Sequence, residues 1–102
     1  MDCDAIISTL NKHRTELQQL GVVSASLFGS AARGDNTPLS DIDIAVRLDP
    51  ARTPRGLSYV GFVEAIRERL EVLLESEVDL VPEPAVKRRL QDEIDKDRIL
   101  AF

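Results

Sequence analysis

Residues 22–48 read VVSASLFGSAARGDNTPLSDIDIAVRL, and this stretch decides the fold. The first seven residues form a short, mainly apolar run that stops at Gly29, which predicts a strand over 22–28. Residues 29–40 are dense in Gly, Ser, Asp, Asn and Pro, and predict a turn-rich loop with one helical turn at 30–33. Residues 41–48 alternate in polarity and predict a second strand, with Asp41 and Asp43 on the same face.

The flanking sequence supplies helices and two further strands. Apolar spacings of three and four predict a helix over 4–20, capped by Asp2 or Asp4 and ended by Gly21. Ser58 can cap a second helix that runs to about residue 75 and buries Val60 on its apolar stripe. A third helix is expected over 84–96, with Val86 buried, and strands are expected over 77–81 and 99–102.

This order of elements predicts an α/β fold, a small mixed sheet of three or four strands. We expect the helices on one face of the sheet and the functional site on the other. No linker, repeat or low-complexity segment interrupts residues 1–102, so one domain is expected.

Composition narrows the classes of function. The chain has 102 residues, a net charge of −5 and a single cysteine, Cys3. The negative charge argues against sequence-blind nucleic-acid binding, and one cysteine excludes an intrachain disulfide. With one His and one Cys, a metal site would need oxygen ligands. The acidic start of the chain and the lack of a long apolar run favour a soluble, cytoplasmic protein without a membrane segment.

Three acidic residues stand where strands are expected. Asp is disfavoured in strands, and Asp41 and Asp43 at i and i+2 place like charges on one face. Asp79 interrupts the apolar run EVDLV, where an unpaired charge is costly. Mg²⁺, which prefers carboxylate oxygens, would compensate all three charges.

The turn before these residues offers groups that suit phosphate. Gly29 follows a strand and permits a tight turn with close backbone approach, and Ser30 adds a hydroxyl beside free N–H groups. Phosphate donors on one strand end and metal ligands on the next indicate a nucleoside triphosphate site. The stretch is neither a P-loop nor a dinucleotide fingerprint, because it lacks GxxxxGK[ST] and GxGxxG.

The stretch GSAARGDNTPLSDIDIAV, followed by EVDLV, resembles the nucleotidyltransferase superfamily of the DNA polymerase β type. The chain looks most like its minimal members, the MNT antitoxins of HEPN/MNT toxin–antitoxin pairs. The matching positions are Gly29, Ser30, Gly34, Ser40, Asp41, Asp43 and Asp79.

The resemblance implies an enzyme and a set of roles. Asp41, Asp43 and Asp79 would hold two Mg²⁺ ions, and Asp79 would also help to deprotonate the attacking hydroxyl. Gly29 and Ser30 would hold the phosphates of ATP, the usual donor. The acceptor would be a tyrosine of a partner HEPN ribonuclease toxin, which adenylylation (AMPylation) silences.

Several alternatives stay open at this point. Arg33 could contact the triphosphate or the partner, or it could pair with Asp35 or stay free in water. The basic run at 87–89 is either a solvated face or a contact to the partner or to phosphate. Ser40 is a further candidate for binding the nucleotide. The chain could instead modify a small molecule such as an aminoglycoside, with help from a partner subunit. It could also neutralise a toxin by occlusion alone.

Overall fold

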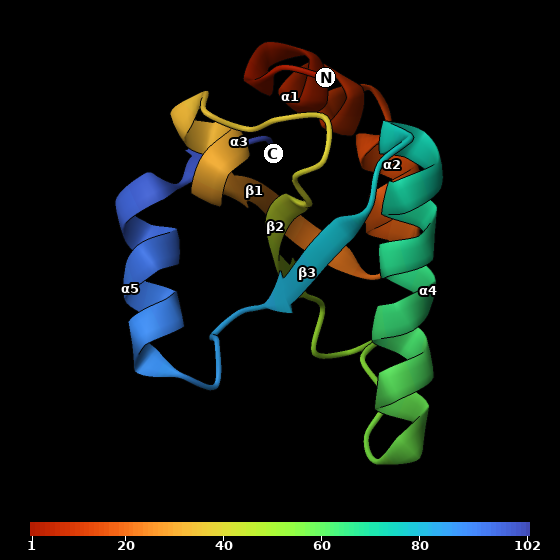
Figure 1. Ribbon diagram of the computed structural model, residues 1–102. Coiled ribbons are helices and arrows are strands. Elements are labelled where there is room, and N and C mark those ends of the chain that lie inside the picture. The colour runs from red at the N-terminus through yellow and green to blue at the C-terminus, as the bar shows by residue number, and fades with distance from the viewer.

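The computed structural model describes residues 1–102 and contains five helices and four strands. A four-stranded mixed sheet lies at the centre, with helices on both of its faces (Figure 1). In chain order the elements are α1 (Cys3–Lys12), α2 (Arg14–Gln19), β1 (Val22–Phe28), α3 (Gly29–Arg33), β2 (Ile42–Leu48), α4 (Leu57–Leu74), β3 (Val78–Pro82), α5 (Arg88–Asp97) and β4 (Ile99–Leu100).

The sheet has the strand order β3-β2-β1-β4. β1 pairs antiparallel with β2 and β4, whereas β2 and β3 run parallel. The parallel pair is joined through α4, as a crossover connection requires. Consequently the starts of β2 and β3 lie at the same end of the sheet, beside the end of β1 and the start of α3.

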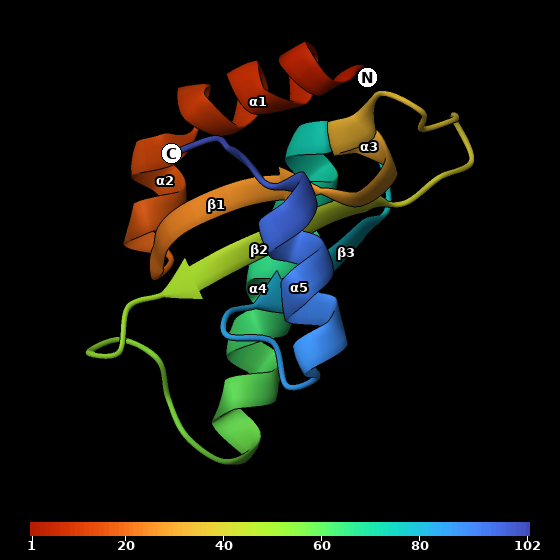
Figure 2. The same ribbon diagram turned by 90° about the vertical axis from the view of Figure 1, so that its left-hand side faces the viewer.

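The alternation of β2 divides its side chains between two packed layers. Ile42, Ile44 and Val46 face the main core, which α1, α2 and α4 cover. Asp43 and Ala45 face the other way, and Ala45 packs with Phe28 and with Ile94 of α5. α5 therefore differs from the other long helices, α1 and α4, and from the expectation that the helices lie on one face. It crosses the opposite face of the sheet, which carries the acidic residues (Figure 2).

The three long predicted helices differ from the sequence prediction in the following ways. The first helix is broken at His13, whose backbone (φ −101°, ψ 17°) leaves the helical region between α1 and α2. α4 begins at Leu57 after Gly56, so Ser58 does not cap it. α5 begins at Arg88 instead of residue 84, because the Ala85 N–H is bound by the Gln91 side chain at 2.8 Å and residues before Lys87 are not helical.

Two residues predicted in the core are exposed. Val60 lies on the first turns of α4, which extend past the sheet, and Val86 lies in the segment before α5. Apolar periodicity in the sequence does not reveal where a helix outruns the sheet that it covers. No helix combines the length and the apolar character that a membrane span requires.

Candidate active site

The parallel register of β2 and β3 brings two of the three predicted acidic residues together. Asp43 is the direct partner of Asp79 across the two strands. Both side chains point to the face of the sheet that α5 crosses, and the Asp43 carboxyl lies within hydrogen-bonding reach of Asp79. Asp43 is half-buried because β2 is central, and Asp79 is exposed because β3 is the edge strand.

Gly29 at the start of α3 packs directly against Asp43. Its φ of +69° is a conformation that other residues rarely adopt, and a Cβ built there would collide with Oδ2 of Asp43. The backbone can therefore turn beside the carboxylate only if residue 29 is glycine. Ser30 follows at the same end of the sheet, so the predicted phosphate donors and the acidic pair share one site.

A cavity of about 500 Å³ connects these groups. Gly29, Ser30 and Arg33 of α3 line it together with Asp43 and Asp79, and α5 supplies its opposite wall. A pocket of this size with a few convergent polar groups is typical of a small-molecule site. The lining residues from α5 are Leu90, Glu93, Lys96 and Asp97.

The electrostatics of the acidic pair favour a cation. Burial, and then the neighbouring charges of Asp79 and Asp41, raise the pKa of Asp43 to about 6. Neither Asp43 nor Asp79 takes part in an ion pair. Two adjacent carboxylates without a bonded basic side chain form a donor set that fits Mg²⁺.

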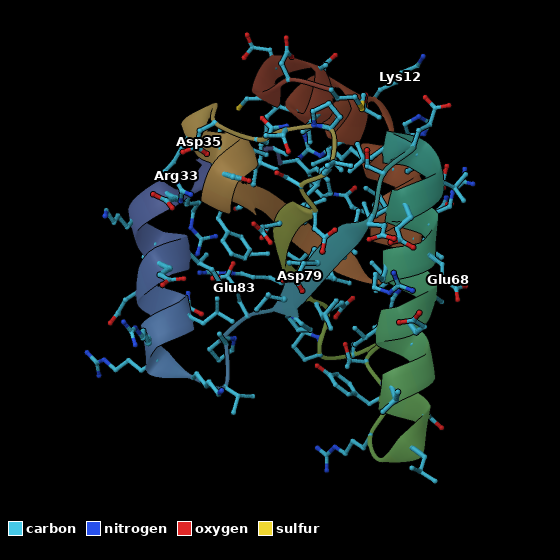
Figure 3. All side chains as sticks on the ribbon, in the orientation of Figure 1. Lys12, Arg33, Asp35, Glu68, Asp79 and Glu83 are labelled. Carbon is cyan, nitrogen blue, oxygen red and sulfur yellow. The ribbon has the colours of Figure 1, made fainter.

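Arg33 ties the two walls of the cavity together. Its Nη1 donates to Oδ2 of Asp97 at 2.8 Å, and its Nε donates to Oδ2 of Asp35 at 3.4 Å. Figure 3 shows Arg33 and Asp35 close together at the α3 side of the molecule. The predicted pair with Asp35 is therefore present, and the shorter contact with Asp97 links α3 to α5 as well.

Two predicted residues lie away from the cavity. Asp41 precedes the first paired residue of β2, is exposed, and lines a neighbouring hollow with Arg67 and Glu71. Ser40 stabilises a turn, since its Oγ accepts from the Thr37 N–H at 3.1 Å. Accordingly, no three acidic, His or Cys side chains gather into a ready metal cluster.

The contribution of α5 to the site was not predicted from the sequence. The sequence points to the basic run at 87–89 for a phosphate or partner contact, yet the cation that α5 places on the cavity wall is Lys96, which forms no ion pair. The sequence signal that could have indicated this contribution was helical spacing, because residues 90, 93 and 97 share one face of a helix. Nothing in the spacing says that this helix packs against α3 and β1.

The family follows from comparison with known proteins. A family model described as "Nucleotidyltransferase domain" matches residues 10–101. The chain belongs to this nucleotidyltransferase family. The match spans the cavity-lining residues of α3, β2, β3 and α5, so the site described above lies in the nucleotidyltransferase domain.

Individual members of the family are similar over most of their length. Protein adenylyltransferase MntA of Thermococcus cleftensis is 39% identical over 85 residues, which cover 82% of this chain and 80% of MntA. A solved structure provisionally identified as a minimal nucleotidyltransferase has a TM-score of 0.76 at 27% identity, covering 97% of this chain and 95% of its own. These similarities confirm the minimal nucleotidyltransferase fold predicted from the sequence.

A third structure contains a toxin and an antitoxin. It is a tri-AMPylated Shewanella oneidensis HEPN toxin in complex with MNT antitoxin, and it matches with a TM-score of 0.63 over 94% of this chain and 71% of the other. The identity of 21% shows a shared fold alone.

Proposed function

We propose that the chain is a protein adenylyltransferase that transfers AMP from ATP to a tyrosine hydroxyl of a HEPN toxin and thereby silences it. The observation that carries the proposal is the pairing of Asp43 with Asp79 across β2 and β3, facing a cavity closed by Gly29 and Ser30. The 39% identity with an adenylyltransferase supports AMP as the transferred group.

The α3 side of the cavity would hold the nucleotide. The backbone at Gly29 and Ser30, with the Ser30 hydroxyl, would bind the terminal phosphates, and Arg33 would add positive charge. We assign Asp43 and Asp79 as ligands of Mg²⁺. Asp41 lines the neighbouring hollow, but its charge reaches Asp43 and raises the pKa of that carboxyl, so we propose it as the third ligand, brought to the ion by rotation of its exposed side chain. Bound there, Mg²⁺ would neutralise charge that develops on the phosphate oxygens.

Asp79 is the group best placed to receive a proton. It is the exposed member of the pair, on the edge strand where an acceptor can approach. The tyrosine oxygen attacks the α-phosphorus of ATP as its proton passes to Asp79. The bond between the α-phosphorus and the bridging oxygen breaks, and pyrophosphate leaves.

Intact-mass measurement of the toxin tests this proposal. The toxin incubated with the chain, ATP and Mg²⁺ should gain AMP, and should gain none with Asp43→Asn, with Asp79→Asn or with EDTA. Asp92→Asn is the matched control, since Asp92 is an exposed acid on α5 outside the cavity. A toxin without added AMP in every reaction would overturn the proposal.

The same reagents separate catalysis from occlusion. A variant carrying both Asp41→Asn and Asp43→Asn should still bind the toxin but should no longer inhibit its ribonuclease activity. Full inhibition by this double variant would mean that binding suffices.

A further inference from the structure

A second, larger hollow lies at the far end of β3 from Asp43 and Asp79. It has a volume of about 670 Å³ and is mainly apolar. We call it the β3-edge groove and define it by Leu48, Tyr59, Val81, Pro82, Val86 and Leu90. It lies between the C-terminal end of β3, the start of α4 and the segment that leads into α5 (Figure 1).

Exposed apolar residues lie in the two segments that border this groove. Residues 57–61, the first turns of α4, are all exposed, with Leu57 at 93% and Val60 at 65%. Val86 on the opposite side is fully exposed. Isolated exposed apolar residues are ordinary, but an apolar groove with an exposed apolar rim is typical of an interaction surface.

The charge around the β3-edge groove is opposite to that of the whole chain. Lys87 lines it, Arg88 and Arg89 follow directly, and Arg55 precedes α4. All four are exposed and none forms an ion pair. The one acid in the lining, Glu83, has a side chain that is 5% exposed and paired with Arg98.

The free edge of β3 is poorly suited to pairing with another strand. The ladder to β2 uses the backbone of residues 77, 79, 81 and 83, so residues 78, 80 and 82 face outward. The Val78 N–H is taken by the Glu71 carboxylate at 3.0 Å, and Pro82 has no N–H. An occupant of the β3-edge groove would therefore pack by its side chains, as an amphipathic helix does.

The groove and the catalytic cavity are neighbours. Leu90 lines both hollows, and β3 carries Asp79 near its start and Pro82 at its end. A protein seated in the groove would hold its neighbouring surface beside Asp79, where the acceptor hydroxyl must come.

We propose that the β3-edge groove is the docking site for the acceptor protein, and that it binds a helix with an apolar face and acidic flanks. This inference rests on the proposed function, since it assigns to the acceptor the surface next to the adenylyltransferase site. Apolar contacts would supply affinity, and the four basic side chains would select the acidic flanks and accelerate association.

Two valines on one helix give a matched test. Val60 and Val72 are both on α4 and both 65% exposed, but only Val60 is next in the chain to a residue that lines the groove, Tyr59. Val60→Asp should weaken binding of the HEPN toxin about tenfold, whereas Val72→Asp should leave the Kd unchanged. Neither should alter binding of ATP alone, measured by calorimetry.

Two lysines test the charge argument in the same way. Lys87→Glu should weaken toxin binding and reduce its dependence on salt, because one attractive contact becomes repulsive. Lys12→Glu is the control, since Lys12 is also exposed and unpaired but lies on α1.

The outcomes separate the docking site from the proposed function. If AMP is transferred but Val60→Asp and Val72→Asp bind the toxin equally, the docking site is wrong and the adenylyltransferase stands. If Val60→Asp alone loses binding but no AMP is transferred, docking stands and the activity is wrong. Undetectable toxin binding by the unaltered chain would overturn both. Val60-dependent self-association or RNA binding, without toxin binding, would assign the groove to another occupant and also overturn the docking proposal.

Discussion

Gly29 and Asp43 occupy adjoining space, so a larger residue at position 29 would collide with the Asp43 side chain. Gly29→Ala should displace the Asp43 carboxylate and weaken ATP binding by at least about tenfold. Gly34→Ala is the matched control, because Gly34 also has a positive φ (+79°), but a Cβ added there would meet no other atom within 4 Å.

Gly34→Ala should lower stability by about 1 kcal/mol, since it forces a side chain into the left-handed region, and Gly29→Ala should lower it by at least as much, because its Cβ also collides with Asp43. Calorimetric titration with ATP and thermal unfolding of both variants check this prediction. Equal ATP affinities for the two variants would contradict the assigned role of Gly29.

The raised pKa of Asp43 makes stability depend on pH. Because the folded pKa, about 6, lies above the unfolded value of 3.8, ionisation of Asp43 destabilises the fold. This destabilisation is absent below pH 3.8, increases between pH 3.8 and about 6, and is complete above about pH 6. Asp43→Asn should therefore stabilise the metal-free protein at pH 8 by about 1 kcal/mol, a value discounted for partial exposure.

Urea unfolding in EDTA at several pH values measures this effect. The difference between Asp43→Asn and the unaltered chain should shrink as the pH falls from 7 to 4. A constant difference across that range would show that Asp43 titrates normally.

Among single residues, the acidic pair and the glycine turn could be predicted from the sequence, but the position of Asp41 could not. Asp43 and Asp79 were predictable because unpaired acids in apolar strands are unfavourable without a function. Asp41 shares the alternation with Asp43, yet it precedes the strand and its side chain lies in another hollow. Alternation alone does not determine the residue at which pairing begins.

α5 is held to the sheet by a buried ion pair. Arg98, directly after the helix, donates to Oε1 of Glu83 at 2.8 Å and to Oγ of Ser26 at 2.9 Å. Because the Glu83 side chain is almost fully buried, Arg98→Ala would leave a carboxylate without its partner. We expect a loss of about 3 kcal/mol in the free energy of unfolding.

Arg69→Ala is the matched control for this element. Arg69 pairs with Glu16, but both side chains are more than a third exposed, so its loss should cost much less stability than the loss of Arg98. Urea unfolding of both variants checks the contrast. Equal losses in the free energy of unfolding would mean that the burial of Glu83 does not make its ion pair more important for stability than the exposed pair.

The elements themselves were largely predictable, and their ends were not. β1 matches its predicted range, and the other long elements were placed within a few residues. The late start of α5 coincides with a particular hydrogen bond, from the Ala85 N–H to the Gln91 side chain. The position of α5 on the site face depends on tertiary packing that helical periodicity does not contain.

For the whole molecule, the net charge did not indicate how charge is distributed over the surface. The chain carries −5 overall, yet unpaired basic side chains gather beside the β3-edge groove while acidic residues line the catalytic cavity. Composition states the size of the chain, and the prediction of oxygen ligands for a metal rests on its single His and single Cys. The distribution of charge depends on which strand lies at the edge of the sheet.

Transfer of label from ATP to the HEPN toxin tests the central claim most directly. With ATP labelled on the α-phosphate, the toxin should become labelled, and with ATP labelled on the γ-phosphate it should not. Asp43→Asn and Asp79→Asn should abolish the signal, and Asp92→Asn should preserve it. Label from the γ-phosphate, or none from the α-phosphate, would contradict adenylyl transfer by this chain.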